Sequence, residues 1–107
     1  MSDATQDAQV TDNTDDSRYE IHTDGELAGF AEYELGDGVI DFTHTEVFEK
    51  FSGKGLAQEL AARSLDESRE RGLEVLPHCG FYAKYIARNP EYVDLVPVDR
   101  RAEFNLA

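Results

Sequence analysis

The sequence predicts an α+β fold: an antiparallel three-stranded meander, a glycine loop, a helix, a parallel strand and a second helix, in that order. Two observations predict it. Residues 19–47 alternate apolar and polar side chains between tight turns, which is typical of strands. Residues 56–71 carry apolar side chains every three or four positions, which is typical of a helix packed on one side. The chain has 107 residues, enough for one modest core, so we expect one folded domain.

The beginning of the chain has the composition of a disordered segment. Residues 2–17 contain five Asp and one branched aliphatic residue, Val10. Such a segment offers too little apolar surface to offset the entropy that ordering would cost. We therefore expect a disordered acidic tail at residues 1–18 and the folded domain at residues 19–107.

The meander is expected from three strand segments and two turns. A hairpin is expected from two strands, residues 19–22 and 27–35. They are separated by residues 23–26, Thr-Asp-Gly-Glu, whose types are typical of a turn. Residues 36–38, Gly-Asp-Gly, suit a tight turn because glycine and aspartate tolerate positive φ angles. The third strand follows at residues 39–47.

The third strand carries the first groups that are suited to proton transfer. If Ile40 and Phe42 face the core, alternation places His44 and Glu46 on the same side, unless a bulge intervenes. A histidine titrates near neutral pH, and a histidine or a glutamate can remove a proton from an amine or a thiol. The alternative is a hydrogen-bonded strand histidine beside a solvated glutamate.

A glycine loop precedes the first helix. Gly53 and Gly55 allow unusual backbone angles, and the first free N–H groups of a helix at this point favour a bound phosphate. The loop lacks the spacing of a Walker A motif and the third glycine of a dinucleotide fingerprint. A plain strand-to-helix connection is the alternative, because glycine turns are common.

The rest of the chain predicts a helix, a buried strand and a second helix. The helix at residues 56–71 has one apolar stripe and ends before Gly72. Its stripe consists of Leu56, Leu60, Ala61, Ser64, Leu65 and Ser68. Residues 73–76 form a short strand parallel to an earlier one, ended by Pro77. A second helix is expected at residues 81–88, followed by a helical turn and an edge strand within residues 91–97.

Cys79 lies where the parallel strand ends and the second helix begins. A helix N-terminus favours the thiolate, which makes a cysteine reactive. A packed, inert thiol is the alternative. In an extended segment His78 points away from Cys79, so the two are not paired. Of Tyr82 and Tyr85 on the second helix, we expect one in the core and the other available as a proton donor.

Composition excludes several classes of function. The chain has 23 acidic and 10 basic side chains and a net charge of -13, which opposes binding to nucleic acid or an anionic membrane. One cysteine closes no intramolecular disulfide, and no cluster with metal-ligand spacing is visible. No apolar run suits a membrane span or a signal peptide. We expect a cytoplasmic monomer without a metal, whose partner is a basic peptide or a small amine.

The order of the motifs resembles that of a known family. The motifs are Asp41-Phe42-Thr43-His44-Thr45-Glu46-Val47, Gly53-Lys54-Gly55-Leu56-Ala57, Leu76-Pro77-His78-Cys79, and Tyr85 with Asn89-Pro90-Glu91-Tyr92. Together they resemble the small, single-domain GCN5-related N-acetyltransferase-like (GNAT-like) family. The likeness covers residues 19–97. It departs from the superfamily pattern at Lys50, where Gln or Arg is usual, and at Gly80, where Ser is frequent.

The resemblance implies a minimal GNAT-like fold that binds acetyl-CoA. It implies that the backbone of Gly53, Lys54, Gly55, Leu56 and Ala57 holds the pyrophosphate. It also implies that the pantetheine lies between neighbouring strands, with Val47 and Asn89 as further cofactor contacts.

The resemblance makes His44 and Cys79 the candidate catalytic pair, with Glu46 as a second candidate base. The implied function is transfer of an acetyl group from acetyl-CoA to an amine, on a peptide lysine or a small molecule. One alternative is a non-catalytic module that binds CoA or a protein partner. Another is a thiol sensor centred on Cys79.

Overall fold

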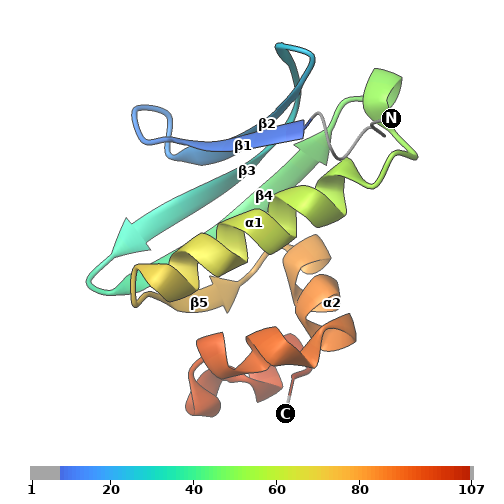
Figure 1. The fold of residues 1–107 in the computed structure, drawn as a ribbon. Coiled ribbons are helices and arrows are strands. Elements are labelled where there is room, and N and C mark those ends of the chain that lie inside the picture. Colours follow the sequence, from blue (N-terminus) through green and yellow to red (C-terminus); the bar gives the residue numbers. More distant parts are fainter. Residues whose placement is uncertain (1–7, 107) are drawn as a thin grey trace.

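The computed structural model describes residues 8–106 and shows a five-stranded sheet with two α-helices (Figure 1). The strands are β1 (Ala8–Asn13), β2 (Arg18–Thr23), β3 (Glu26–Gly36), β4 (Val39–Val47) and β5 (Glu74–Pro77), and they lie side by side in this order. Neighbouring strands from β1 to β4 are antiparallel, whereas β5 is parallel to β4. The helix α1 (Leu56–Glu70) connects β4 to β5, and α2 (Gly80–Arg88) follows β5. The predicted α+β class and the order of elements are confirmed.

The helix α1 buries the stripe of side chains that its sequence predicts. Its buried residues are Leu56, Leu60, Ala61, Ser64, Leu65 and Ser68. They pack against the face of the sheet that carries Ile40 and Phe42, both fully buried. The small residue Ser64 leaves room for Tyr82 of α2, whose hydroxyl lies 2.7 Å from the Ser64 hydroxyl. Both helices therefore contact the same face of the sheet.

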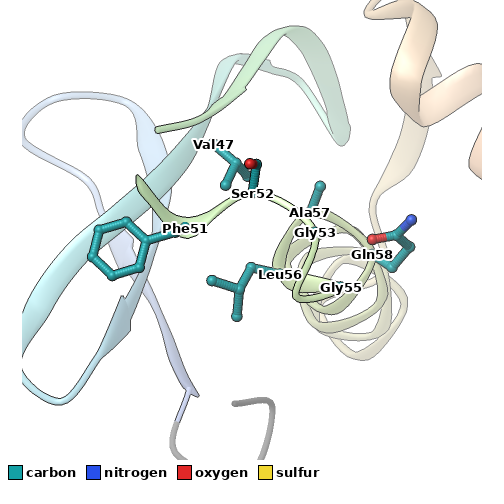
Figure 2. Close-up of a pocket in the computed structure, with 8 residues that line it drawn as sticks. All are labelled: Val47, Phe51, Ser52, Gly53, Gly55, Leu56, Ala57 and Gln58. Atoms are coloured by element: carbon teal, nitrogen blue, oxygen red, sulfur yellow. The ribbon is translucent and has the colours of Figure 1, made fainter. Parts of the chain in front are cut away.

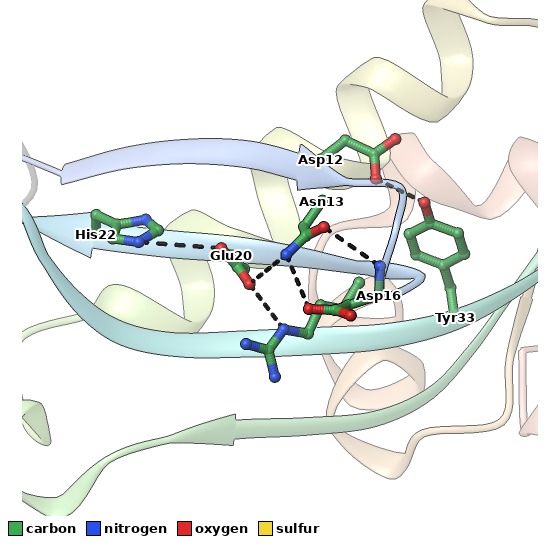
Figure 3. A network of polar contacts seen from close by, with 7 residues as sticks. Asp12, Asn13, Asp16, Glu20, His22 and Tyr33 are labelled. Carbon is green, nitrogen blue, oxygen red and sulfur yellow. Dashed lines mark hydrogen bonds and ion pairs between the residues drawn. The ribbon is translucent and has the colours of Figure 1, made fainter.

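The strand β1 corrects the prediction of a disordered tail, which is wrong for residues 8–18. Residues 1–7 of that predicted tail lie outside the described residues. β1 pairs with β2 along its whole length, from Ala8 opposite Thr23 to Asn13 opposite Arg18. Figure 3 shows its polar contacts: the Tyr33 hydroxyl donates to Asp12 Oδ1 at 2.6 Å, and the side chain of Asn13 donates to a carboxylate of β2. Partners on β2 and β3 thus order a segment whose composition is poor in apolar residues.

A bulge in β4 decides which side chains face the helices. Glu32 of β3 pairs with His44, but the next β3 residue pairs with Phe42, so Thr43 is an extra residue in β4. Because side chains alternate along a strand, one extra residue exchanges the two faces from that point onward. Ile40 and Phe42 therefore face the core, whereas His44 points to the opposite face.

The C-terminal part of the chain differs from the prediction of an edge strand, which is wrong. In the described residues, α2 is followed by three 3-10 helices: η2 (Pro90–Leu95), η3 (Val98–Arg100) and η4 (Ala102–Phe104). A further 3-10 turn, η1 (Glu49–Phe51), precedes the glycine loop. The edge strand fails because the backbone turns on itself: the Val96 and Arg100 amides donate to carbonyl groups three residues earlier. Val96 and Phe104 are buried and add this segment to the core.

Candidate functional site

A cavity of about 390 Å³ lies where the glycine loop meets the first turn of α1. Figure 2 shows the loop running from Phe51 into the helix around this space. The lining residues are Val47, Phe51, Ser52, Gly53, Gly55, Leu56, Ala57 and Gln58. Val47 is the last residue of β4, so the cavity joins the end of that strand to the start of α1.

The start of α1 is built to leave its backbone donors free. Gly53 and Gly55 have φ angles of 78° and 74°, a left-handed conformation that other residues adopt at a cost. Gly55 is the N-cap residue and offers no side chain to bond the amides of the first turn. The first N–H groups of a helix have no partner within the helix, and they carry the positive end of its dipole. This end of α1 therefore favours an anionic group in the cavity.

Of the two lysines near the start of α1, Lys50 precedes the glycine loop and Lys54 lies within it. Lys50 is tied to the start of β3 by an ion pair of 2.9 Å with Glu26. Both ammonium groups lie over the Phe51 ring, that of Lys50 at 5.4 Å and that of Lys54 at 5.9 Å from its centre. Lys54 does not line the cavity, but it sits between the two glycines that do. Lys54 is therefore the lysine placed to add positive charge beside the loop.

The strands β4 and β5 separate next to the cavity. Their parallel pairing ends at Phe42 opposite Pro77, and the Cys79 amide then donates to the Phe42 carbonyl at 2.7 Å. β4 continues to Val47 beyond this point. Its last residues, 43–47, have no neighbouring strand on that side in the described part of the chain. A gap thus opens between β4 and β5, and it extends from the end of their pairing toward the cavity at Val47.

The backbone of β4 presents donors to this gap. The Phe48 amide donates to the Ala28 carbonyl of β3 at 2.9 Å. Because the N–H and C=O groups of successive strand residues point to alternate sides, those of Thr45 and Val47 point away from β3. They face the edge from which β5 departs. An N–H group at this edge can donate to a carbonyl oxygen placed in the gap.

Cys79 lies at the same gap, in contact with Thr45. Its thiol is half-buried and donates to the Thr45 hydroxyl at 3.2 Å. Cys79 is also the N-cap residue of α2, and its carbonyl accepts the Ala83 amide at 3.1 Å. His78 points elsewhere, toward Asp41. The sequence placed Cys79 at this helix start but missed its partner Thr45.

His44 and Glu46 lie on the other face of the sheet. Their side chains are 56% and 49% exposed, and His44 Nε2 lies 3.5 Å from Glu46 Oε1. The His44 ring packs beside Phe30, with ring centres 6.1 Å apart. Because Thr45 and its contact Cys79 lie on the helix-covered face, the structure does not bring His44 and Cys79 together. Both candidate bases stand next to the gap, but on the face without an α-helix in the described chain.

The two tyrosines of α2 take different places. Tyr82 is fully buried, and its ring stacks on Phe42 with centres 4.2 Å apart. Burial raises the pKa of Tyr82, and the Ser64 hydroxyl is its hydrogen-bond partner. Tyr85 is half-buried beside Tyr92. Burial, followed by nearby carboxylates, raises the pKa of Tyr85, so this phenol keeps its proton and remains a candidate donor.

Asn89 is placed away from the residues that line the cavity. Its side-chain amide donates to the Tyr85 carbonyl at 2.8 Å and so closes the end of α2. Its predicted contact with the cofactor stays a prediction.

The structure adds cavity residues that the sequence analysis missed. They are Phe51, Ser52 and Gln58. Gln58 could have been found, because it belongs to the same first turn of the helix as Leu56 and Ala57. Ser52 directly precedes Gly53 and begins the glycine loop that the sequence predicts. Phe51 carries no such signal, since the 3-10 turn that places it has no distinctive sequence pattern.

A comparison with family models decides the family. The model of the GCN5-related N-acetyl-transferase matches residues 18–95. The chain belongs to this family. Membership supports acetyl transfer as the class of reaction, and GCN5-related N-acetyltransferases generally use acetyl-CoA. The match begins at β2, so β1 lies outside it.

Relatives and a solved structure agree with this family. Protein NATD1 of Homo sapiens is 36% identical over 56 residues, which cover 52% of this chain and 50% of that protein. Protein NATD1 of Gallus gallus is 36% identical over 56 residues, covering 52% and 51%. The match thus spans about half the length of these curated relatives. A protein of Staphylococcus aureus described as GCN5-like, solved by NMR, has a TM-score of 0.64 at 19% identity over 91% of each chain, which shows the same fold.

Two kinds of feature do not occur among the described residues, 8–106. No helix there is long and apolar enough to cross a membrane. No group of three or more His, Cys, Asp or Glu side chains in residues 8–106 is arranged so that it could hold a metal ion.

Proposed function

We propose that the chain is an acetyl-CoA-dependent N-acetyltransferase that transfers an acetyl group to an amine, on a peptide lysine or a small molecule. The observation that carries this proposal is that the cavity and the open edge of β4 meet at one residue, Val47. The cavity at the start of α1 is lined by Val47, and Val47 is also the end of the open edge of β4. An elongated ligand can therefore have its anionic part at the helix and its reactive end in the gap.

The residues at the helix start fit the diphosphate of CoA. The cavity of about 390 Å³ suits part of an elongated ligand, and free amides of the first turn face it. Lys54 adds a positive charge from the loop. When bound there, acetyl-CoA supplies a thioester whose acetyl group is activated for transfer.

The backbone of β4 is suited to hold the thioester oxygen. We assign this role to the amide of Val47 or to that of Thr45, two residues earlier on the same edge of β4. Donors that are fixed before the reaction stabilise the negative charge that develops on such an oxygen. The role needs no side chain.

In this proposal, the base that accepts the amine proton is either His44 or Glu46. Both lie on the face without an α-helix, so the amine approaches from that face while the helix start holds the diphosphate. His44 and Glu46 are about half exposed and within 3.5 Å of each other. A net charge of -13 favours a cationic acceptor such as a basic peptide.

Cys79 has two possible parts in the transfer, and one measurement separates them. As an acyl carrier, its thiolate attacks the thioester, forms an S-acetyl bond and releases the CoA thiolate. The amine then takes the acetyl group, gives its proton to the base His44 or Glu46, and frees the Cys79 thiolate. In direct transfer, Cys79 stays unmodified beside the departing CoA sulfur. Mass analysis after incubation with acetyl-CoA alone detects an acetylated Cys79 only in the first case.

A non-catalytic module that binds CoA is the second candidate function. The exposure of His44 and Glu46 favours it, because no described element encloses either base. In that case the fold would bind CoA and a protein partner without turnover. A cytoplasmic monomer is proposed for both functions.

A calorimetric titration with acetyl-CoA, followed by a CoA-release assay with a panel of amines, tests the proposal. We expect binding, turnover with cationic amines, and a loss of about a hundredfold or more in rate for His44→Gln if His44 is the base. Cys79→Ser and Glu46→Gln are measured in the same way, and His22→Gln on β2 is the matched control.

The outcomes separate the candidates. Full activity of both His44→Gln and Cys79→Ser contradicts the assigned roles. Binding without turnover supports the module. No binding of CoA contradicts both functions. A normal, unreactive Cys79 thiol contradicts the alternative function of a thiol sensor.

A further inference from the structure

The side chain of His78 joins three parts of the fold. Its Nδ1 lies 2.8 Å from Asp41 Oδ1 on β4, and its Nε2 lies 3.3 Å from Glu103 Oε2 on η4. Its ring meets the Phe104 ring edge-on, with centres 5.0 Å apart. His78 itself follows the last residue of β5. One imidazole thus connects β4, the end of β5 and the C-terminal segment, residues 97–106.

Only the charged form of His78 satisfies both carboxylates. A neutral imidazole has one N–H, whereas the imidazolium has two. With both ring nitrogens facing carboxylate oxygens, loss of the proton leaves either Asp41 or Glu103 opposite a lone pair. The geometry therefore favours the imidazolium.

The C-terminal segment is held by apolar packing of Phe104 and Leu106 on the core and by polar side-chain contacts of Glu103 and Arg101. Phe104 is buried and, with Asn105, lines an open pocket of about 210 Å³ together with Gly80, Ala83, Lys84 and Ala87 of α2. The segment's amides bond mainly within the segment: Phe104 N–H and Leu106 N–H both donate to the Arg101 carbonyl. The contact of Glu103 with His78 is thus a main polar link between the segment and the sheet.

We propose that the charged imidazolium of His78 fastens the C-terminal segment to the sheet, and that this segment loosens when His78 loses its proton. The device is independent of acetyl transfer. It acts at the start of α2, because Gly80 lines the same pocket as Phe104 and directly follows Cys79.

The charged neighbours of His78 favour its protonated form. Asp41 faces it from β4 and Glu103 from η4, and Arg100 of η3 binds Glu103 at 2.7 Å. The hydrogen bond with Asp41 is the largest cause that raises the pKa of His78; partial burial opposes it, and Glu103 adds to it. Because the folded-state pKa is raised, the stabilisation is complete below the unfolded pKa of about 6.5 and is lost as the pH rises through the folded value.

The test compares hydrogen exchange of the segment with the titration of His78. NMR gives the pKa of His78 from its ring shifts. Amide protection factors, corrected for the intrinsic pH dependence of exchange, are measured for Phe104, Asn105 and Leu106 at pH 5.5 and pH 8.5. We expect protection to fall about tenfold for each unit by which docking raises the pKa of His78.

Three variants make the test specific. His78→Gln is expected to show low protection at both pH values, since it cannot charge. Glu103→Gln is expected to lower the pKa of His78 and to reduce the change in protection. His22→Gln, a histidine on the distant strand β2, is expected to keep the wild-type behaviour.

Two results overturn the proposal. One is equal protection of the segment at pH 5.5 and pH 8.5 in the wild type. The other is a pH-dependent change that persists in His78→Gln. If His78→Gln does not fold, the result for Glu103→Gln decides whether the proposal holds. A pH dependence of protection that is unchanged in Glu103→Gln contradicts the proposal. CoA is absent from the experiment, so its outcome does not depend on the proposed function.

Discussion

The two ends of α1 are built in opposite ways. The N-terminal end has a glycine cap, no side chain bonded to its amides and a cavity in front. At the C-terminal end, side chains from three strands and the helix meet: the Tyr19 hydroxyl donates to Glu67 Oε2 at 2.7 Å, and Arg71 lies 3.3 Å from Asp12 Oδ2. Asp12 also accepts the Tyr33 hydroxyl.

The difference shows how one helix serves both stability and binding. Polar groups at the C-terminal end satisfy one another, so that end fixes the helix to β1, β2 and β3. The N-terminal end leaves donors unsatisfied, which costs stability unless water or a ligand accepts from them. Changes at the N-terminal end should therefore alter binding, and changes at the C-terminal end should alter the free energy of unfolding.

The largest effect is expected for Gly55→Asp, measured as affinity for CoA by calorimetry. A carboxylate about 5 Å from the diphosphate, at an effective dielectric constant of about 20, repels it by about 3 kcal/mol, or roughly a hundredfold in affinity. Gly72→Asp is the matched control. Gly72 lies just after the other end of α1 and has a similar φ angle of 71°, so the backbone strain is alike.

Equal losses of affinity in Gly55→Asp and Gly72→Asp would break the comparison. The loss would then come from a strained backbone or a weakened helix rather than from repulsion of the ligand. An unchanged affinity of Gly55→Asp for CoA would show that the start of α1 is not part of the binding site.

The second effect is expected for Asp12→Ala, measured as the free energy of unfolding in urea. The substitution removes the acceptor of the Tyr33 hydroxyl and the ion-pair partner of Arg71, which costs about 1–3 kcal/mol. Asp16→Ala, in the exposed turn between β1 and β2, is expected to stay within about 0.5 kcal/mol of the wild type. CoA affinity should not change in either variant. Equal stability of the two variants would show that β1 is not fixed to the domain in solution.

The smallest effect is expected for Lys54→Ala, which should lower CoA affinity about twofold to fivefold at low salt, since an exposed charge contributes roughly 1 kcal/mol or less. Lys50→Ala should leave the affinity unchanged, because Lys50 is paired with Glu26. Added salt should reduce the effect of Lys54→Ala. A larger loss in Lys50→Ala than in Lys54→Ala would reverse the roles of the two lysines.

Much of the fold follows from local sequence patterns. The strand at residues 39–47 and the six buried residues of α1 agree with the prediction, because periodicity reports directly which side chains can be buried together. β1 does not follow from its composition. Asp12 and Asn13 are ordered by Tyr33 and Glu20, which lie on other strands. Such contacts between distant residues leave no trace in the local pattern.

The candidate site follows from the sequence in part. The glycine loop and the position of Cys79 at a helix start were predictable, because both depend on the local order of strand, turn and helix. The faces of His44 and Glu46 were not, because one inserted residue, Thr43, reverses them. The contact of Cys79 with Thr45 depends on how far β4 and β5 stay paired, which only the assembled sheet determines.

The bulge at Thr43 divides β4 into two halves with different sequence requirements. Before it, the even-numbered positions Ile40 and Phe42 must be apolar; after it, the odd-numbered positions Thr45 and Val47 face the gap. An engineer can therefore replace His44 and Glu46 with side chains of other sizes and charges without repacking the core. Deleting Thr43 would do the opposite, because it would turn both polar side chains toward the helices and expose Thr45 and Val47 in their place.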